Sequence, residues 1–350
     1  MWNDFFTAVL AVSLWQLLRW CFRALPNENR QILGCIPLSK EGPDSWKGLN
    51  LTYYGLFVSA AVVAAVCMIF VLMGSIGVPI GITGASLLLI LPVWALATKL
   101  TARLVEKKLH TFTIGGATFV LLLITPLALL LTNALAGTKF GVQVPMLPFL
   151  AAVAVAYAVG EGIGRLACIS FGCCYGKPIS QCGPMIRRIF GGHGFVFTGK
   201  TKKIAYESGL DEQEVVPIQA ITSSVHIVVG LAALVLYLHS AFFSSFVLAM
   251  TATQGWRAFS ETLRADYRGG GKITAYQIMA GLGVVYTVLL ALLVPGQDVG
   301  RPDILAGLSA LWHPGVILAL QGVGLGTFLI AGRSMVTASS LSFRVLEDKI

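Results

Sequence analysis

The stretch GEGIGRLACISFGCCYGKP, residues 160–178, holds the most unusual chemistry of this chain. It continues an apolar run at 144–159 that has the composition of a membrane helix. It contains one carboxylate, one guanidinium and three thiols: Glu161, Arg165, Cys168, Cys173 and Cys174. Ionisable groups are costly inside a membrane and usually mark a functional site. We therefore expect the other charged segments of the chain to contribute to the same face.

The composition indicates an all-α, polytopic membrane helix bundle. Hydrophobic residues make up 56% of the sequence and charged residues 12%, with a mean hydropathy of +0.80, whereas soluble domains carry about 25% charged residues. The net charge of +9 would suit nucleic-acid binding. In so apolar a chain, basic residues more often serve membrane topology and phospholipid head groups, so we expect no nucleic-acid partner.

Apolar runs predict about eight spans and one larger extramembrane loop. The spans are expected at 51–73, 82–97, 112–136, 144–164, 218–238, 242–259, 273–294 and 316–331. A further run at 5–18 is short for a span and could cross the membrane or lie at its interface. We divide the chain into an N-terminal apolar segment with a polar link (1–48), a membrane domain (49–295) with a loop subdomain at about 177–216, and an extra C-terminal span with a polar tail (296–350).

Basic residues concentrate on one side of this topology. When the loops alternate sides across the eight spans, only Lys139 and Arg301 fall on one side, which leaves 23 of the 25 basic residues on the other. The positive-inside rule would place that face in the cytoplasm. A cationic site for a phosphorylated lipid is a compatible explanation.

Two constellations carry charges at membrane depth. Glu161 and Arg165 are four residues apart and can pair on one helix face, either as a structural ion pair or as a phosphate-binding arginine with its partner. The segment WRAFSETLR (256–264) puts Arg257 and Glu261 at the same spacing, with Arg264 three residues further on. Its apolar neighbours favour an inward-facing site over a solvated helix end.

The clustered cysteines have three interpretations. They are small packing residues, a redox pair, or, together with Cys182 and His193, metal ligands. The C-x4-C-C spacing differs from the C-x2-C of structural zinc sites, and adjacent cysteines form only a strained bridge. The sequence favours packing over redox chemistry and redox chemistry over metal, and we expect no metal or cofactor.

Together these motifs resemble those of the prolipoprotein diacylglyceryl transferases, integral membrane enzymes of bacteria. Their signature, roughly G-R-x-G-N-F-x-N-x-E-x-x-G, is similar to GRLACISFGCCYG at 164–176, which keeps the arginine and the last glycine. Other similar segments follow in order: TYYGLF (52–57), the arginine segment around Arg103, FTIGG (112–116), VPIQ (216–219), WRAFSETLR and ITAYQ (273–277). The chain would be a divergent branch with GCCYG, resembling the family over about 50–281.

The chain departs from this pattern at positions where the family has polar residues expected to take part in the reaction. Ile114 and Val216 stand where the family has histidines, and Cys168, Phe171 and Cys173 replace the asparagines and the glutamate of the signature. Family members also expose their active face on the periplasmic side, whereas the basic residues here favour the cytoplasm. The arginines that would hold phosphate are retained.

The resemblance implies a multi-pass protein of the bacterial inner membrane that moves a diacylglyceryl group from a phospholipid, phosphatidylglycerol in the family, to the thiol of a lipoprotein precursor. The catalytic candidates are Arg165, Arg257, Glu261, Arg264 and Glu161, with Glu161 handling the proton. The substrate-binding candidates are Tyr54, Arg103, Gln219, Gln277 and Gly176. Two alternatives stay open: a non-catalytic lipid- or partner-binding protein of the same fold, and a membrane thiol oxidoreductase that uses Cys168, Cys173 and Cys174.

Overall fold

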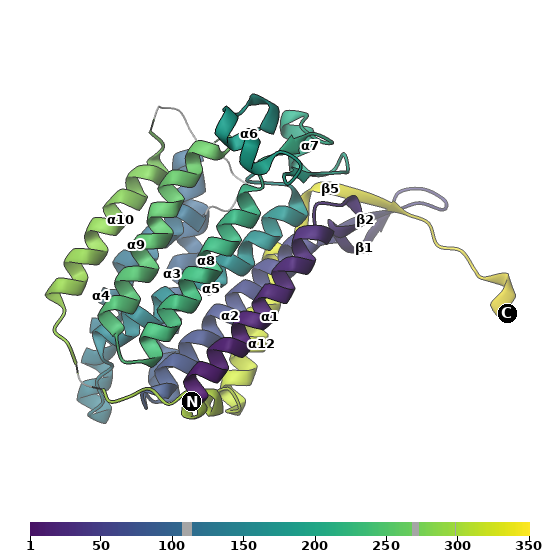
Figure 1. Cartoon of the computed structure of the whole chain (residues 1–350). Coiled ribbons are helices and arrows are strands. Elements are labelled where there is room, and N and C mark those ends of the chain that lie inside the picture. The colour runs from purple at the N-terminus through teal and green to yellow at the C-terminus, as the bar shows by residue number, and fades with distance from the viewer. Residues whose placement is uncertain (107–113, 268–272, 298) are drawn as a thin grey trace.

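The computed structural model describes residues 1–106, 114–267, 273–297 and 299–350, and confirms the all-α helix bundle. Long helices run side by side in alternating directions (Figure 1). They are α1 (Trp2–Ala24), α2 (Tyr53–Ser75), α3 (Ile80–Thr101), α4 (Ile114–Phe140), α5 (Met146–Phe171), α8 (Ile218–Leu238), α9 (Phe242–Ser260), α10 (Ala275–Leu293) and α12 (Pro314–Ala331). The short helix α11 (Ile304–Ala310) precedes α12.

Among the described residues, eight helices are long and apolar enough to cross a membrane, so the chain is a multi-pass membrane protein. The set differs from the predicted one in two places. Helix α1 qualifies at 23 residues, because it extends beyond the apolar run at 5–18 on both sides. Helix α9 does not qualify, since its serines, threonines, Gln254 and Arg257 lower its hydropathy. Helix α9 nevertheless packs against α5, α8 and α10.

Helix α5 is the centre of the bundle. In its most apolar window 94% of the residues are buried, and its neighbours are α2, α8 and α9. Glycines permit this close packing: a Cβ on Gly162 would lie 2.7 Å from the side chain of Ile227. The Ser223 hydroxyl also donates a hydrogen bond of 2.6 Å to the Gly162 carbonyl. Residues 160–171 of the stretch quoted first therefore lie at the centre of the bundle.

Residues 172–217 form the predicted larger loop at one end of the bundle (Figure 1). It contains η3 (Ile179–Gln181), α6 (Pro184–Phe190), α7 (Lys203–Ser208) and a two-stranded antiparallel sheet of β3 (Phe195–Val196) and β4 (Glu214–Val215). The fully buried Lys202 Nζ donates hydrogen bonds to the carbonyls of Leu25 and Ser170. This lysine joins the loop to the ends of α1 and α5.

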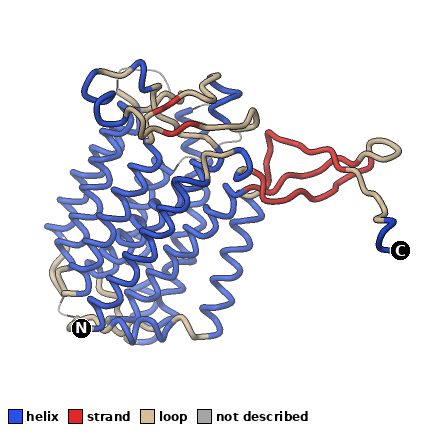
Figure 2. Tube along the Cα trace, turned by 45° about the vertical axis from the view of Figure 1, so that its right-hand side comes forward, coloured by secondary structure: helices blue, strands red, loops and turns tan. Residues whose placement is uncertain are grey.

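A three-stranded antiparallel sheet projects sideways from the same end (Figure 2). Its order is β1 (Ile32–Lys40), β2 (Trp46–Thr52) and β5 (Arg333–Leu341). These strands lie where the sequence led us to expect a polar link and a polar tail. The prediction missed them because β5 pairs with a strand about 280 residues earlier, a contact that no local pattern reveals.

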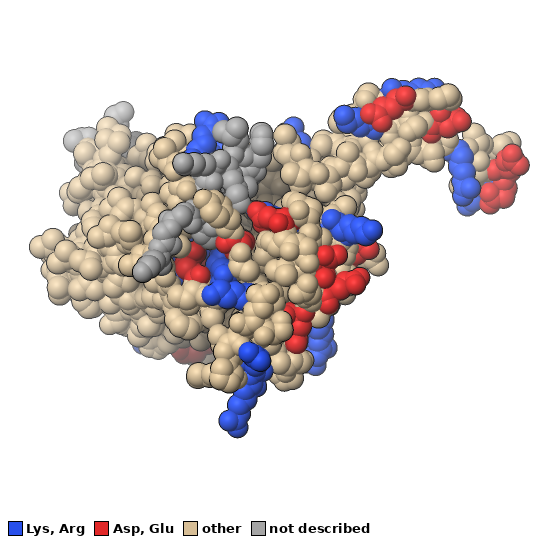
Figure 3. Space-filling model, turned by 90° about the horizontal axis from the view of Figure 1, so that it is seen from above, with Lys and Arg blue, Asp and Glu red and all other residues tan. Residues whose placement is uncertain are grey.

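Seen from this end, Lys and Arg side chains mix with Asp and Glu over the loop and along the sheet (Figure 3). Two turns that follow α3 and α9 are the π-helical turn η2 (Ala102–Glu106) and η4 (Glu261–Leu263), and the Lys177 amide of the loop donates to the Leu263 carbonyl of η4. The 3-10 turns η1 (Glu28–Arg30) and η5 (Glu347–Lys349) flank the sheet strands. The described basic residues of these loops therefore share one end of the molecule, as the alternation of spans predicted.

Candidate functional site

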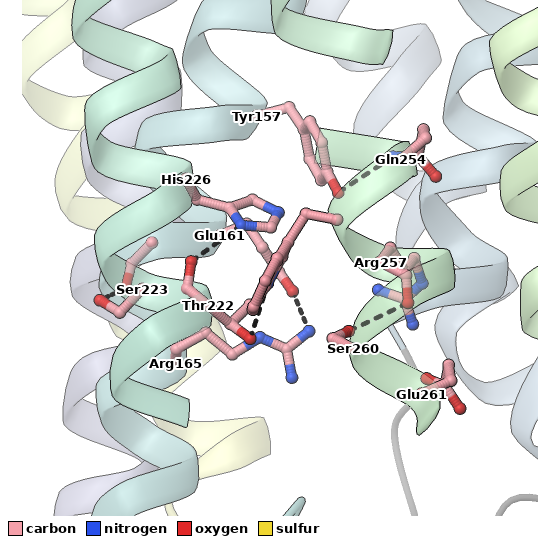
Figure 4. A network of polar contacts seen from close by, with 12 residues as sticks. Tyr157, Glu161, Arg165, Thr222, Ser223, His226, Gln254, Arg257, Ser260 and Glu261 are labelled. Carbon is pink, nitrogen blue, oxygen red and sulfur yellow. Dashed lines mark hydrogen bonds and ion pairs between the residues drawn. The ribbon is translucent and has the colours of Figure 1, made fainter. Parts of the chain in front are cut away.

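A small polar cavity lies where α5, α8 and α9 meet below the loop. Seven residues line it: Arg165, Thr222, His226, Arg257, Ser260, Glu261 and Arg264. Figure 4 shows α5 and α8 contributing one side and α9 the other. Three arginines from segments up to 99 residues apart thus reach one space, which we call the arginine cavity.

Helix α5 contributes a buried ion pair. Arg165 Nη2 contacts Glu161 Oε1 one helical turn away, and both side chains are almost completely shielded from solvent. This contact confirms the pair that the four-residue spacing predicted. The Arg165 Nε, also buried, has no hydrogen-bond partner among the described residues. Arg165 therefore keeps one donor for a group that enters the cavity.

The end of α9 contributes Arg257, and a glycine of α4 makes room for it. A Cβ on Gly115 would lie 1.8 Å from Arg257 Nη2, so no other residue fits at position 115 unless the guanidinium moves. The Arg257 guanidinium also lies 5.7 Å from the centre of the Tyr276 ring, within range of a cation–π interaction. The first glycine of FTIGG thus leaves the space that the Arg257 guanidinium occupies.

Arg264 is the most strongly paired of the three arginines. It donates two hydrogen bonds to the Asp266 carboxylate, at 2.8 and 2.7 Å, and its Nη1 lies 4.0 Å from Glu261 Oε1. Burial opposes its charge, but the Asp266 carboxylate, with Cys174 and Glu261, outweighs this and raises the pKa of Arg264. The guanidinium therefore stays charged at any physiological pH. Asp266 was not among the sequence candidates.

His226 is one of three lining residues that sequence reasoning missed, together with Thr222 and Ser260. Its Nδ1 donates a hydrogen bond of 2.9 Å to the Thr222 carbonyl, which leaves Nε2 as the unprotonated nitrogen. That Nε2 is buried and has no hydrogen-bond partner among the described residues. His226 lies seven residues after Gln219, on the same helical face, so the helical period of VPIQAITSSVH was the available signal. Its geometry suits proton acceptance.

A small apolar cavity lies near the arginine cavity. It lies between α4, α5 and α9 and is lined mainly by aliphatic and aromatic side chains. Tyr157 lines it, and the Tyr157 ring also meets the His226 ring edge-on at 6.0 Å. Gln254 Nε2 donates a hydrogen bond of 3.3 Å to the Tyr157 hydroxyl (Figure 4). Tyr157 therefore lines the apolar cavity and contacts a residue that lines the polar one.

Two predicted substrate-binding glutamines make hydrogen bonds within the protein. Gln219 Nε2 donates to the Cys173 carbonyl at 2.9 Å, while its buried Oε1 has no partner in the described part of the chain. Gln277 closes the N-terminus of α10 in a capping box with Thr274 and donates to the Ala258 carbonyl at 3.1 Å. Gln219 retains an acceptor for a ligand, whereas Gln277 fixes the start of α10 beside α9.

The other three predicted substrate-binding residues do not line the arginine cavity and have different surroundings. Gly176 pairs its backbone with Arg264, and a Cβ there would lie 2.3 Å from the Val216 carbonyl oxygen. Tyr54 packs on Phe171 and interacts electrostatically with the cluster of thiols and with Arg165. Arg103 is exposed in η2 and does not line the cavity. The substituted position Ile114 has no described side chain, and Val216 is fully buried.

Comparisons with protein-family models, curated proteins and solved structures find no match for this chain. The similarity to the diacylglyceryl transferases therefore stays a prediction from the motifs quoted above. What the arrangement can do chemically follows from its own geometry. Three guanidiniums can bind a phosphate, a histidine nitrogen can accept a proton, and an apolar cavity can receive a hydrocarbon chain.

Proposed function

We propose that the chain is a phospholipid-dependent transferase of the bacterial inner membrane, which moves a diacylglyceryl group from phosphatidylglycerol to the thiol of a lipoprotein precursor. The single observation that carries this proposal is that three arginines line one polar cavity inside a membrane bundle, with an apolar cavity close by on the other side of Tyr157. A phospholipid has the matching division, with an anionic phosphate next to hydrocarbon chains.

The three arginines bind the phosphate in this proposal. Arg165 and Arg257 contact it from opposite sides of the cavity, while Glu261 and Asp266 hold Arg264 in place. As the bond between the glycerol carbon and the phosphate oxygen breaks, negative charge grows on the departing glycerol phosphate. Guanidiniums fixed in a water-poor site stabilise that charge more than water does.

The acceptor thiol must lose its proton as its sulfur forms the new bond to the glycerol carbon. Two groups of the cavity can take this proton, His226 through its Nε2 and Glu161 through its carboxylate. Glu161 is already paired with Arg165, whereas the described residues give His226 Nε2 no competing partner. The proposal therefore assigns the base to His226 and the orientation of Arg165 to Glu161, in place of the proton-handling role expected from the sequence.

The direct test incubates the purified protein with phosphatidylglycerol and a lipobox peptide. The readouts are the mass gain of one diacylglyceryl group on the peptide and the release of glycerol phosphate. Arg165→Ala should reduce both by at least about 100-fold, in line with the loss of one oxyanion-stabilising donor. Arg188→Ala provides the matched control, because this arginine is exposed on α6. Equal turnover in wild type and Arg165→Ala would contradict the proposal.

The same assay separates the two rival functions. Saturable binding of phosphatidylglycerol by folded protein, without either product, would identify a non-catalytic lipid-binding protein. A thiol oxidoreductase would instead show a redox-dependent mass shift of its own thiols, which the arginine substitutions would leave unchanged. Three thiols lie close together in the structure, and their geometry has a further implication.

A further inference from the structure

Three thiols converge at the C-terminal end of α5. The Sγ atoms of Cys168, Cys173 and Cys174 all lie within 4.8 Å of one another. Within the described ranges, this is the one group of three or more Cys, His, Asp or Glu side chains close enough to hold a metal ion. All three are free thiols and partly buried. We call them the thiol cluster.

The backbone, rather than a disulfide, brings these sulfurs together. Helix α5 ends at Gly172, whose φ of 70° reverses the chain, and the Cys173 amide then donates to the Cys168 carbonyl at 3.0 Å. Cys174 has a φ of 57°, a left-handed conformation that costs a non-glycine residue about 1 kcal/mol. Strain of this kind persists where the surrounding contacts fix it, and it is concentrated at functional sites.

Side chains and backbone from other elements hold this turn. Gln219 donates to the Cys173 carbonyl at 2.9 Å. The Ala265 amide donates to the Tyr175 carbonyl at 3.1 Å, and the Lys177 amide donates to the Leu263 carbonyl at 3.0 Å. The positions of the three sulfurs are therefore set by the fold before any ligand binds.

Positive charges surround the thiol cluster. Arg264 and Arg165 both interact electrostatically with Cys174, and Lys203 interacts with Cys173 and Cys174. Positive charge near the sulfurs favours thiolates, and the thiolate, not the thiol, is the metal ligand.

We propose that Cys168, Cys173 and Cys174 form a three-thiolate site for a soft monovalent cation, Cu(I). The three thiols release their protons to solvent as the ion binds, and no electron is transferred. Three thiolates and one Cu(I) leave two negative charges next to the guanidiniums of Arg165 and Arg264. This proposal stands independently of the transferase function.

Ligand number separates Cu(I) from Zn(II), the other ion that thiolates favour. A structural zinc site has four ligands, and the two residues that would complete such a set are engaged elsewhere. Cys182 Sγ donates to the Pro178 carbonyl at 3.4 Å, and His193 is exposed, with Nδ1 against the Gly192 carbonyl. Cu(I) is satisfied by three sulfurs. A disulfide between Cys173 and Cys174 is disfavoured, since adjacent cysteines bridge only with strain.

The test titrates the full-length, reduced protein in detergent with Cu(I) under anaerobic conditions, against a chromophoric Cu(I) chelator. We expect one Cu(I) per chain, with X-ray absorption showing only sulfur ligands, three in number. Single variants Cys168→Ser, Cys173→Ser and Cys174→Ser should each weaken binding at least about 10-fold. Cys35→Ser is the matched control, because this cysteine lies in β1 of the projecting sheet, and its affinity should equal that of wild type.

Four outcomes would overturn the site. The first is no Cu(I) retained by reduced protein that elutes as a folded species, and the second is equal binding by the triple serine variant. The third is a Zn(II) complex with four protein ligands in preference to Cu(I). The fourth is a disulfide within the cluster as the stable state under the anaerobic, reducing conditions of the assay. Circular dichroism of each variant separates loss of binding from loss of fold.

Discussion

Helices α5 and α12 have almost the same hydropathy but opposite environments. Their most apolar windows have mean values of 1.7 and 1.8, yet 94% of the α5 window is buried inside the protein and only 6% of the α12 window. Hydropathy therefore places both helices in the membrane without distinguishing the centre of the bundle from its lipid-facing edge. The paired charges of α5 make that distinction, because ionisable groups at membrane depth face the interior of a bundle. Glycine content does not, since α12 contains four glycines and α5 three.

A matched pair of glycine substitutions tests whether α5 is buried and α12 is not, and it has the largest expected effect. In Gly162→Val on α5, the new side chain meets Ile227 and the Ser223 carbonyl, with even the Cβ only 2.7 Å from Ile227. Overpacking of this kind costs about 1–3 kcal/mol or more. We expect Gly162→Val to lower the thermal midpoint by several degrees or to prevent folding in detergent.

Gly322→Val on α12 is the control, because nothing lies within 4 Å of a Cβ at that position. Its thermal midpoint should stay near that of wild type. Equal destabilisation by the two substitutions would mean that α12 is covered by a partner as completely as α5 is covered by its neighbours.

A second pair tests the arginine cavity that α5 helps to build. Gly115→Ala inserts a methyl group into the space of the Arg257 guanidinium. Displacement of this group should lower transferase turnover at least about 10-fold while the protein stays folded, since misplacement by about 1 Å already costs enzymes up to 100-fold. Gly84→Ala on α3 has open space around its Cβ and should leave turnover unchanged. Wild-type turnover in Gly115→Ala would remove Arg257 from the mechanism.

The smallest expected effect concerns the last turns of the two helices. Lys202 donates to the Ser170 carbonyl of α5, and Arg333 donates to the Leu329 carbonyl of α12 at 2.6 Å. Burial lowers the pKa of Lys202 from 10.5 to about 8. Between these values the unfolded chain holds more protons than the folded one, so the free energy of unfolding should rise with pH across about 8–10.5.

Lys202→Met should remove this rise, which amounts to at most about 3 kcal/mol for a shift of this size. Arg333→Met should retain it, because Arg333 is exposed and stays charged throughout. The measurement is the thermal midpoint of wild type and both variants at pH 7, 8, 9 and 10. A wild-type slope equal to that of Lys202→Met would show that the lysine titrates normally.

The sequence predicted the parts of this molecule that depend on local pattern. The Glu161–Arg165 pair needed only helical spacing, and the convergence of Arg165, Arg257 and Arg264 at one end needed only the alternation of spans. The capping role of Gln277 was also readable, since Thr274 and Gln277 have the spacing of a capping box. We predicted a substrate-binding role for Gln277 instead, because ITAYQ resembles a motif of the family.

Other features depend on contacts that no local pattern encodes. The side chain of His226 faces the arginine cavity because α8 packs against α5, and the three sulfurs meet because Gly172 and Cys174 adopt left-handed conformations. The spacing C-x4-C-C alone argued against a metal site. Despite this spacing, the turn at Gly172 places Cys173 next to Cys168, and the Cys173 amide donates a hydrogen bond to the Cys168 carbonyl.

The projecting sheet has a consequence for the order in which the molecule is completed. Strand β2 is made early and can pair at once with β1, but its other edge pairs with β5, which follows about 280 residues later. A Cβ on Gly55, in the first turn of α2, would lie 2.1 Å from the Gly332 Cα, so the segment that leads into β5 also packs against the start of α2. During synthesis one edge of β2 therefore stays unpaired until β5 has been made. Unpaired edges invite association with other chains, which makes the interval before β5 is made a period of risk for this protein.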